Sequence, residues 1–237
     1  MQLVYTEGVS VSGQQTLQAD EFKRHLRDSL ERETRNSRAI KIARHDNVYT
    51  AGEPSETIYF IESGQIKLVI FSMEGREGLL SIHSEGDIFG EMCLTGSGPR
   101  IDTATAMEAT TLKQVSCSQF LECLRHNSLI EGFVRYLAAR IADQQHVIAN
   151  LVTVDSEKRL AQTLLRLAHN IGKKDVNSIR IELRISQAEL SQMVGTTRPR
   201  ISLFMQRFQN LGLIETNKDH FFIIKEKKLT DYVGQIQ

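Results

Sequence analysis

The stretch from Asn127 to Val152, NSLIEGFVRYLAARIADQQHVIANLV, decides how the rest of the chain is organised. It contains no proline, and its one glycine, Gly132, lies near its start. The pattern predicts a helix, because one stripe of residues recurs at alternating steps of three and four. The stripe consists of Val134, Leu137, Ile141, Gln144, Ile148 and Leu151.

This stripe has the spacing of the contact seam in a two-stranded helical coil, sustained for about three heptads. We therefore expect a long helix at residues 127–154 that pairs two copies of the chain as a homodimer. A long amphipathic helix inside one domain is the alternative. The amide of Gln144 lowers the stability of a seam, which indicates a residue that sets the register or contacts a ligand.

The composition is that of a globular protein. The chain has 237 residues, 41% of them hydrophobic and 24% charged, which suits one large or two ordinary domains. Its first ten residues lack the basic start and apolar run of a signal peptide, and no apolar stretch reaches membrane-spanning length. We expect a cytoplasmic protein with no membrane partner.

Cysteine usage agrees with that expectation. The three cysteines, Cys93, Cys117 and Cys123, include no CxxC pair. Their odd number favours a reducing compartment over a disulfide framework. They also provide no four-cysteine set for zinc or an iron–sulfur cluster, so we expect no metal site.

The zero net charge of the whole chain hides an asymmetry between its halves. Residues 1–155 contain 15 Lys and Arg against 21 Asp and Glu, whereas residues 156–237 contain 14 against 8. A basic C-terminal module suggests an anionic partner, and nucleic acid is the first candidate.

The residues before the long helix predict a strand-rich domain. Residues 1–39 read as a mostly polar extension with a loose first dozen residues and a short helix at Ala19–Glu33. Residues 40–126 alternate short apolar runs with glycine turns, which favours an antiparallel jelly-roll barrel of about eight strands. A short helix at Ser118–Arg125 follows. The predicted strands are Lys41–Tyr49, Ile58–Ile61, Ile66–Phe71, Leu79–Ile82, Ile101–Ala109 and Thr111–Ser116.

The residues after the long helix predict a second domain at 155–237. Asp155 or Ser156 is a suitable N-cap for a helix that Gly172 ends, and Asn177–Ile185 alternates like a strand. The whole chain is therefore an α+β protein, in which a barrel, a long helix and a helical module follow one another.

The segment ISQAELSQMVGTTRPRISLFMQRF at Ile185–Phe208 predicts a helix-turn-helix. Ser186 and Glu189 form a capping box, and Gly195 suits the turn, where a positive φ is needed. Thr196 or Thr197 caps the second helix, whose first turn tolerates Pro199. The residues expected to face inward are Leu190, Val194, Ile201, Phe204 and Phe208.

The second helix has the basic start of a DNA-reading helix, which would enter the major groove. Two apolar runs in Leu211–Lys227 flank Asn217–His220, which predicts the hairpin wing of a winged helix. An ordinary helical hairpin with surface arginines is the alternative. The residues expected at DNA are Ser186, Gln187, Thr197, Arg198, Arg200, Ser202 and Lys218.

This order of parts resembles the superfamily of the cyclic-AMP receptor protein and the fumarate–nitrate regulator. The resemblance covers roughly residues 40–227 and implies that the barrel senses a signal and the long helix pairs two subunits. It also implies that the dimer binds a two-fold symmetric DNA site and acts with RNA polymerase. Besides the helix-turn-helix, it rests on YFIESGQIKLVI (Tyr59–Ile70), EGDIFGEMCLTG (Glu85–Gly96) and KRLAQTLLRLA (Lys158–Ala168).

The resemblance also implies a cyclic-nucleotide site. In members that bind cyclic AMP or cyclic GMP, an arginine after Gly-Asp-x-x-Gly-Glu meets the phosphate and the glutamate takes a ribose hydroxyl. Paired N–H donors and one guanidinium suit any such anion. This chain departs from the pattern, because Ile101 replaces the usual Ser or Thr and the loop is about one residue short. The implied effector residues are Gly90, Glu91, Met92, Arg100 and Ile101, with Gln144 and Gln145 at the positions that face the base.

Alternatives to this effector remain open. The chain could regulate without an effector, or sense a different ligand: His83 and Cys93 are the residues near the loop that haem would need, although a lone His or Cys is usually structural. A redox-responsive cysteine would need a lowered thiol pKa, which a sequence does not reveal.

Two other function classes compete with a regulator. A nucleotide-controlled enzyme would need catalytic residues in 156–237, but this region holds two histidines, no cysteine and no GxSxG or P-loop motif, so we expect no enzyme. A scaffold dimer that does not bind DNA is opposed by Arg198, Arg200 and the basic charge of this half.

Overall fold

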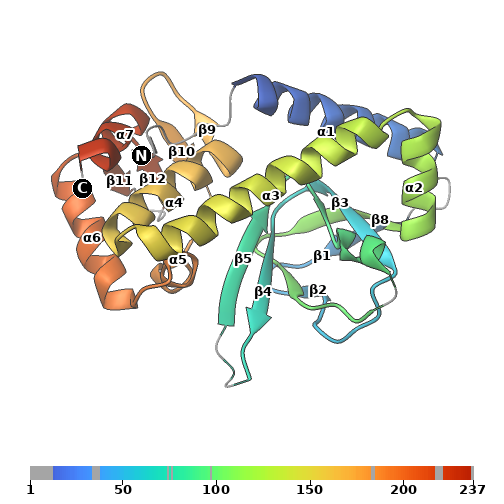
Figure 1. Ribbon diagram of the computed structural model, residues 1–237, viewed down its shortest axis with the longest axis horizontal. Helices are drawn as coiled ribbons and strands as arrows, with labels where there is room; N and C mark the ends of the chain where they lie inside the picture. Colours follow the sequence, from blue (N-terminus) through green and yellow to red (C-terminus); the bar gives the residue numbers. More distant parts are fainter. Residues whose placement is uncertain are drawn as a thin grey trace, which may run out of the picture.

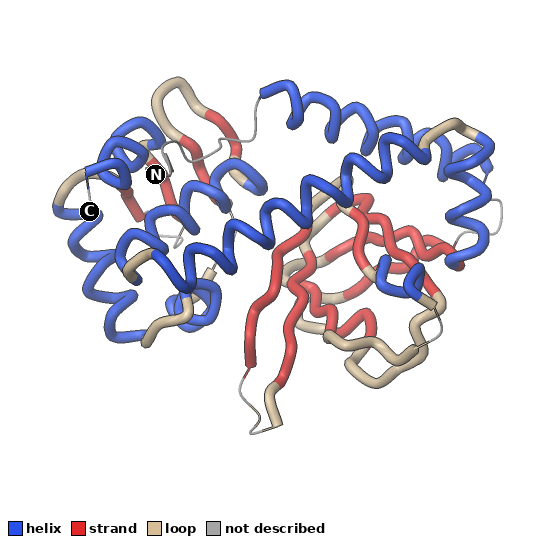
Figure 2. The backbone as a smooth tube through the Cα atoms, viewed as in Figure 1, coloured by secondary structure: helices blue, strands red, loops and turns tan. Residues whose placement is uncertain are grey.

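The computed structural model describes residues 13–33, 38–73, 75, 77–96, 98–182, 185–216 and 221–235. A strand-rich N-terminal domain and a smaller C-terminal domain lie at the two ends of one long helix, α3 (Figure 1). Strands occur in both domains, and most of them lie in the N-terminal domain (Figure 2). The first dozen residues, predicted to be loose, lie outside the described residues.

The N-terminal domain contains two four-stranded antiparallel sheets that enclose a core. The sheets have the orders β1-β8-β3-β6 and β2-β7-β4-β5. Buried side chains from both, among them Tyr59, Ile66 and Phe89, form one cluster. This arrangement confirms the predicted barrel-like jelly-roll. The strands are β1 Arg38–Ile42, β2 Asn47–Tyr49, β3 Thr57–Ser63, β4 Ile66–Phe71, β5 Glu77–His83, β6 Ile88–Phe89, β7 Thr103–Ala106 and β8 Thr110–Ser116.

Three strand predictions were wrong in extent. Among the described residues of Asn177–Ile185, only Ile179–Ile181 form a strand. The single strand at Lys41–Tyr49 is two strands, because a turn containing His45, with a φ of 72°, interrupts the extended backbone. The chain changes sheet at this turn, so that β1 pairs with β8 and β2 pairs with β7. The strand expected at Ile101–Ala109 is limited to β7, because Ile101 lies in a bend and is exposed.

Three helices cover the barrel. α1 spans Gly13–Glu33, longer than the helix predicted at Ala19–Glu33, and packs against α3 and α2 (Figure 1). Its residues Phe22, Leu26 and Leu30 are buried in a core that also contains Phe133 of α3. α2 spans Cys117–His126, close to its predicted bounds. α1 therefore belongs to the packed body of the N-terminal domain.

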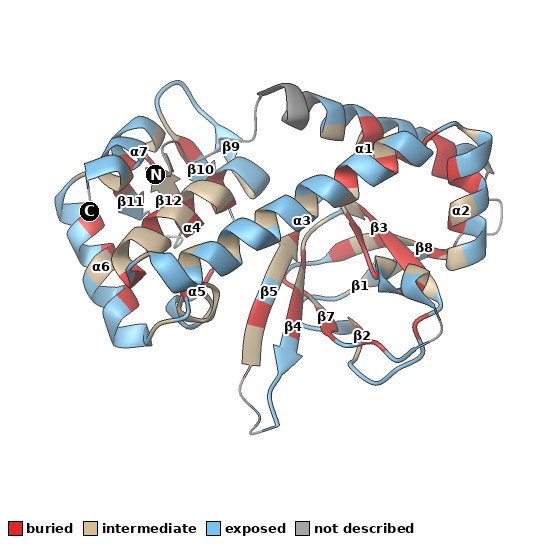
Figure 3. Ribbon diagram, viewed as in Figure 1, coloured by how far each residue is buried: buried red, intermediate tan, exposed pale blue. Residues whose placement is uncertain are grey.

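The long helix α3 spans Ile130–Thr153. It begins three residues later than predicted, because Asn127 caps α2 and Ser128 has a φ of 57°. Beyond its first two turns, most of α3 is exposed (Figure 3). The predicted domain divisions at 39/40, 126/127 and 154/155 stay predictions.

The C-terminal domain is a winged helix-turn-helix. A four-stranded sheet of order β11-β12-β10-β9 supports four helices around one buried core. The helix α7 was not predicted; its residue Leu229 is fully buried and α7 packs against α4. The elements are α4 Ser156–Ile171, β9 Lys173–Lys174, β10 Ile179–Ile181, α5 Gln187–Val194, α6 Arg198–Asn210, β11 Ile214–Thr216, β12 Phe222–Ile224 and α7 Glu226–Gln235.

The expectation of no disulfide was wrong, because Cys93 and Cys117 are joined in a disulfide. The first follows β6 and the second begins α2, and the fold brings both beside β3. A sequence separation of 24 carries no recognisable pairing signal, and Cys123 made the count odd. Among the described helices, none combines the length and the apolar character that a membrane span requires.

Candidate effector site and DNA interface

The predicted effector loop begins at the end of β6 with Gly90, whose φ is 80°. A Cβ atom at this position would lie 2.8 Å from Arg100 Nη1 and 3.1 Å from Thr57 O, so the site requires glycine. A short 3-10 helix, η1, follows at Glu91–Thr95, and the chain then leads to Arg100. The fold thus brings Gly90 and Arg100 together, as the motif predicts.

Arg100 points into the protein. It is only 4% exposed, and its Cζ atom lies 4.2 Å from the centroid of the Tyr49 ring. Its Nη1 donates to Gly90 O at 2.9 Å, and its Nη2 donates to Thr57 O at 2.6 Å. Among the described residues its Nε has no hydrogen-bond partner. Nη2 also donates to Thr57 Oγ1 at 3.1 Å, so three of the five N–H groups of the guanidinium are used by Gly90 and Thr57.

A carboxyl group lies near this guanidinium. Asp102 is 8% exposed, hydrogen-bonds to Tyr49 and interacts electrostatically with Arg100 and Glu91. Burial is the largest cause that raises the pKa of Asp102 above its ordinary value. Burial, followed by the charge of Asp102, also raises the pKa of Tyr49. An anion bound at Arg100 would therefore also approach the carboxyl group of Asp102.

Glu91 connects the loop to α3. Its Oε1 forms an ion pair with Arg140 Nη1 at 3.0 Å, and both side chains are mostly buried. Its Oε2 has no hydrogen-bond partner among the described residues. Arg140 Nη1 also donates to Ile88 O at 3.2 Å. Sequence reasoning missed Arg140, although it lies one helical turn before Gln144.

The other predicted effector residues do not converge on Arg100. Met92 and Ile101 are 47% and 63% exposed. Gln144 and Gln145 are exposed on α3. The residues that do meet are Gly90, Glu91 and Arg100, with Asp102 and Tyr49 added by the fold.

This set partly fits the cyclic nucleotide that the resemblance implies. The orphaned Arg100 Nε can donate to an acidic group, and the orphaned Glu91 Oε2 can accept from a hydroxyl. Asp102 opposes a negative charge.

The helix-turn-helix has the local geometry that its sequence predicts. Ser186 N donates to Glu189 Oε2 at 2.9 Å and Glu189 N donates to Ser186 Oγ at 3.1 Å, which completes the capping box. Gly195 has a φ of 66°, and a Cβ there would lie 2.9 Å from Leu151 Cδ2. The core residues are Leu190, Val194, Ile201, Met205 and Phe208, with Phe204 partly buried.

The start of α6 is open to solvent. Thr197 is its N-cap, although its side chain makes no capping hydrogen bond, and Pro199 lies in its first turn. Arg198 and Arg200 are both exposed. Lys218, predicted at the tip of the wing, lies outside the described residues.

Arg159 of α4 was missed by sequence reasoning. Its guanidinium donates to Val154 O at the end of α3, to Val194 O at 2.9 Å and to Gly195 O at 3.4 Å. It therefore fastens the turn of the helix-turn-helix to the junction between the two domains. The only sequence signal was a basic residue in the first turn of a helix.

The barrel also touches the helix-turn-helix directly. Lys67 Nζ on β4 lies 3.2 Å from Glu189 Oε1 on α5 and 3.4 Å from Glu77 Oε1 on β5. Beside this contact is a hollow of about 920 Å³ between the domains. Its C-terminal wall includes the predicted DNA contacts Ser186, Gln187 and Ser202, and its barrel wall includes Arg44, His45 and Met107.

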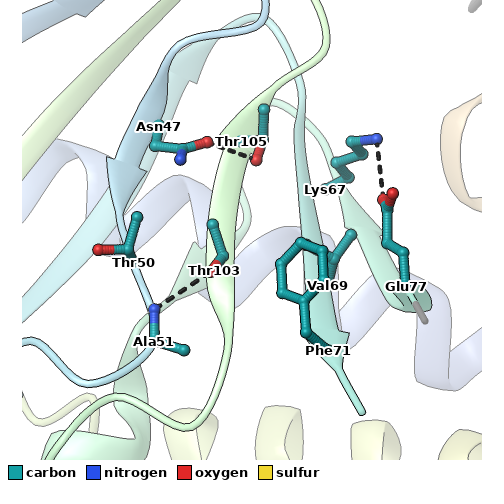
Figure 4. Close-up of a pocket in the computed structure, with 9 residues that line it drawn as sticks. All are labelled: Asn47, Thr50, Ala51, Lys67, Val69, Phe71, Glu77, Thr103 and Thr105. Atoms are coloured by element: carbon teal, nitrogen blue, oxygen red, sulfur yellow. Dashed lines mark hydrogen bonds and ion pairs between the residues drawn. The ribbon is translucent and has the colours of Figure 1, made fainter. Parts of the chain in front are cut away.

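A second, smaller hollow lies on the outer face of the barrel, with a volume of about 440 Å³ (Figure 4). Lys67 and Glu77 bound one side of it and Phe71 projects beside them. The threonines of β7 form its floor, and Thr105 Oγ1 donates to Asn47 Oδ1 at 2.8 Å. Lys67 borders both hollows and, through Glu189, connects this face of the barrel to the helix-turn-helix.

Both domains match families of known proteins. Residues 39–127 match the family described as "Cyclic nucleotide-binding domain", and residues 158–232 match the "Crp-like helix-turn-helix domain". The chain belongs to the superfamily of the cyclic-AMP receptor protein and the fumarate–nitrate regulator.

Members of this superfamily resemble the chain over most of its length. A "CRP-like cAMP-activated global transcriptional regulator" of Mycobacterium tuberculosis is 29% identical over 201 residues, 83% of this chain and 88% of the relative. The "cAMP-activated global transcriptional regulator CRP" of Pasteurella multocida is 27% identical over 169 residues, 70% of this chain and 80% of the relative.

Solved structures of the superfamily share the fold. FixK2 from Bradyrhizobium japonicum superimposes with a TM-score of 0.70 at 17% identity, covering 82% of this chain and 96% of FixK2. A CRP-family transcriptional regulator from Thermus thermophilus superimposes with a TM-score of 0.65 at 25% identity, covering 83% of this chain and 97% of the other.

Proposed function

We propose that this protein is a homodimeric, sequence-specific DNA-binding transcription regulator whose activity is set by a small effector at Gly90–Arg100. The observation that carries the proposal is the exposed basic start of α6, with Arg198 and Arg200 on a correctly capped helix-turn-helix. Guanidinium groups there can donate to base edges and phosphates in the major groove. RNA polymerase is the expected further partner.

The exposed seam of α3 supports the homodimer. Val134, Ile141 and Ile148 are 58%, 54% and 61% exposed, although all three are apolar. An apolar stripe of this kind is stable in water when a second copy covers it. A pairing of two α3 helices would place the two α6 helices in one two-fold arrangement, which matches a palindromic DNA site.

The hollow between the domains suggests how DNA binding is controlled. The predicted DNA contacts Ser186, Gln187 and Ser202 line it opposite barrel residues, so the barrel lies on the side from which DNA would approach them. We therefore expect DNA binding to involve a movement of the C-terminal domain relative to the barrel. The Lys67–Glu189 ion pair and the Arg159 contacts lie where that movement would occur.

Cyclic AMP or cyclic GMP is the leading effector class. Arg100 would meet the cyclic phosphate, and Glu91 would accept a hydrogen bond from a ribose hydroxyl. A regulator without an effector, or with a different ligand, is the second candidate, because Arg100 is already satisfied at Nη1 and Nη2 by Gly90 and Thr57.

Binding experiments test both halves of the proposal. Fluorescence anisotropy would compare a DNA site selected from a random duplex pool with its scrambled version, from 50 to 200 mM salt. We expect preference for the selected site and affinity that falls steeply with salt, on the order of 10³-fold or more if the dimer neutralises about six phosphates. Equal affinity for both duplexes would contradict sequence-specific binding.

Calorimetry with cyclic AMP and cyclic GMP tests the effector. Arg100→Leu should lower affinity by about 1.5–3 kcal/mol, because the phosphate loses a charged donor. Arg125→Leu, at an exposed arginine of α2, is the matched control and should bind like the parent. If the parent protein gives no heat with either nucleotide, the second candidate is favoured.

A further inference from the structure

The Cys93–Cys117 disulfide holds the predicted effector loop near its middle. The loop starts at Gly90 and ends at Arg100, and Cys93 is the buried residue of η1 between them. Its partner Cys117 is the first residue of α2, and the two Cα atoms lie 6.6 Å apart. The bond therefore joins the loop to a helix that packs on α3.

The backbone hydrogen bonds at the ends of η1 are local. Cys93 N donates to Gly90 O at 3.3 Å, and Gly96 N donates to Cys93 O at 3.4 Å. Thr95 Oγ1 likewise donates to Met92 O at 2.8 Å. Such bonds define the shape of the turn but do not fix its position on the barrel. The position of η1 depends on the disulfide, on the packing of Cys93 and Leu94 in the core, and on the Glu91–Arg140 ion pair.

The disulfide also lies at the edge of the core that contains the start of α3. Cys93, Phe120, Phe133 and Tyr136 belong to one buried cluster, and Cys117 packs against it. Glu91, two residues before Cys93, pairs with Arg140 on the same helix. A displacement of η1 would therefore reach both the effector pocket and α3.

We propose that the Cys93–Cys117 disulfide is a reducible clamp on the effector loop, so that reduction by a dithiol loosens η1 and weakens effector binding. A clamped loop needs less ordering when a ligand binds, and this preorganisation raises affinity. The part concerning affinity rests on the proposed effector function. The part concerning the loop does not.

The exchange reaction is balanced by the dithiol itself. One thiolate of the dithiol attacks Cys117 Sγ, since Cys117 is half-buried whereas Cys93 is only 8% exposed. A mixed disulfide forms, the Cys93–Cys117 bond breaks, and Cys93 leaves as a thiolate that takes a proton. The second thiol of the reductant then displaces Cys117, and the reductant becomes a cyclic disulfide after giving up two electrons.

The test compares the full-length oxidised protein with the same protein reduced by dithiothreitol. Hydrogen–deuterium exchange measures the loop directly, and we expect amides 91–96 to exchange about tenfold faster after reduction. Calorimetry with cyclic AMP and cyclic GMP should show about tenfold weaker binding in the reduced protein. Cys117→Ser should behave like the reduced protein under both conditions. Cys123→Ser, which alters the cysteine outside the disulfide, should keep the response.

The outcomes separate this inference from the proposed function. Faster exchange at amides 91–96 together with weaker nucleotide binding in the reduced protein supports both the clamp and the cyclic-nucleotide effector. Faster exchange without nucleotide binding in either state supports the clamp and overturns the cyclic-nucleotide effector. If exchange at 91–96 is the same in both states, or if mass spectrometry finds that the disulfide does not form or is not reduced by the dithiol, the clamp is overturned, whatever the effector.

Discussion

Glu91 Oε1 lies 3.0 Å from Arg140 Nη1, so the loop that begins the predicted effector pocket is bonded directly to the helix predicted to join two subunits. Both side chains are less than one-fifth exposed. A buried charge that loses its partner is strongly disfavoured, because neither water nor another charge compensates it. Through this ion pair, a displacement of Glu91 on effector binding can change the position of α3.

Replacing this arginine should destabilise the N-terminal domain. Arg140→Gln leaves the Glu91 carboxylate mostly buried without its cation, and we expect a loss of about 1.5–3 kcal/mol in the free energy of unfolding. Arg135→Gln is the matched control on the same helix, because the Arg135–Glu131 pair is 60% and 78% exposed. Exposed pairs of this kind contribute about 0–1 kcal/mol. Urea denaturation of both variants measures the difference, and equal losses would show that burial of the Glu91 pair adds nothing.

A charge in the exposed seam of α3 should split the dimer. Ile141→Asp would place two like charges across the interface, where unpaired charges are costly to bury. We expect a monomer at micromolar concentration in analytical ultracentrifugation. Ala142→Asp is the control, since Ala142 is exposed but lies outside the stripe, about 100° further around the helix. A dimeric Ile141→Asp variant would mean that the seam lies elsewhere.

Removing the charge of Asp102 should raise the affinity of the predicted effector site for anions. Asp102→Asn keeps a partner for Tyr49 but removes the negative charge near Arg100, and affinity for a cyclic nucleotide should rise on the order of tenfold. Asp46→Asn, at an exposed aspartate of the barrel, should have no effect. Unchanged affinity in the Asp102→Asn variant would show that the phosphate does not approach this group.

The same substitution predicts a change in the dependence of stability on pH. Burial is the main cause that raises the pKa of Asp102 above 3.8. The folded state therefore keeps this proton to a higher pH than the unfolded chain, and stability falls as pH rises from 3.8 through the raised pKa. Relative to the parent, Asp102→Asn should gain stability across that window and keep the gain at pH 7. Parallel stability curves would contradict the raised pKa.

Several features of this fold were readable from the sequence because they depend on neighbouring residues. The capping box at Ser186, the αL turn at Gly195 and the N-cap at Asp155 are local, and all three have the expected geometry. The strand Ile66–Phe71 was predicted to the residue, since it is an apolar run between two turns. The Gly90–Arg100 contact was also found, because it follows a known motif.

The features that sequence reasoning missed depend on contacts between distant segments. The disulfide, the Glu91–Arg140 pair and the Lys67–Glu189 pair join residues that are 24, 49 and 122 positions apart. Asp102 lies in a bend beside Arg100, because β7 begins at Thr103 and not at Ile101 as predicted. No periodicity or spacing marks such pairs in a single sequence.

A buried histidine should make the protein acid-labile. His83 is 5% exposed, and burial, followed by the charge of Arg140, lowers its pKa from 6.5 to about 4. Between pH 6.5 and about pH 4, His83 is therefore protonated in the unfolded chain but neutral in the folded protein. The free energy of unfolding falls as pH falls through this range. The expected loss is about 3 kcal/mol between pH 6.5 and pH 4.

His83→Gln should remove most of this loss, because glutamine does not titrate and can still hydrogen-bond to Ser81 Oγ. Asp87 lies next to His83, but its contribution falls in a different window. Burial alone would raise its pKa, yet Lys23 and its other partners lower it below 3.8, so its stabilisation is lost only at more acidic pH. Urea denaturation at pH 6.5, 5.5 and 4.5 distinguishes the two groups. A parent and variant that lose stability equally would show that His83 takes up its proton in the folded state.

The last prediction concerns how α6 reads DNA. Two α6 helices in a dimer should enter successive major grooves about 34 Å apart. Arg198 is the first residue of α6, where a guanidinium can bind O6 and N7 of a guanine, whereas we expect Arg200 to contact phosphate. Arg198→Ala should cost about 1–3 kcal/mol per base contact and relax preference at one base pair in each half-site. Arg200→Ala, the comparison on the same turn, should weaken all sequences alike and reduce the salt slope by about one unit for each phosphate that is no longer neutralised. Binding of a selected site and its single-base variants across salt concentrations measures both effects. If Arg198→Ala instead weakens binding equally for every variant, Arg198 is a phosphate contact, and another residue of α6 reads the base.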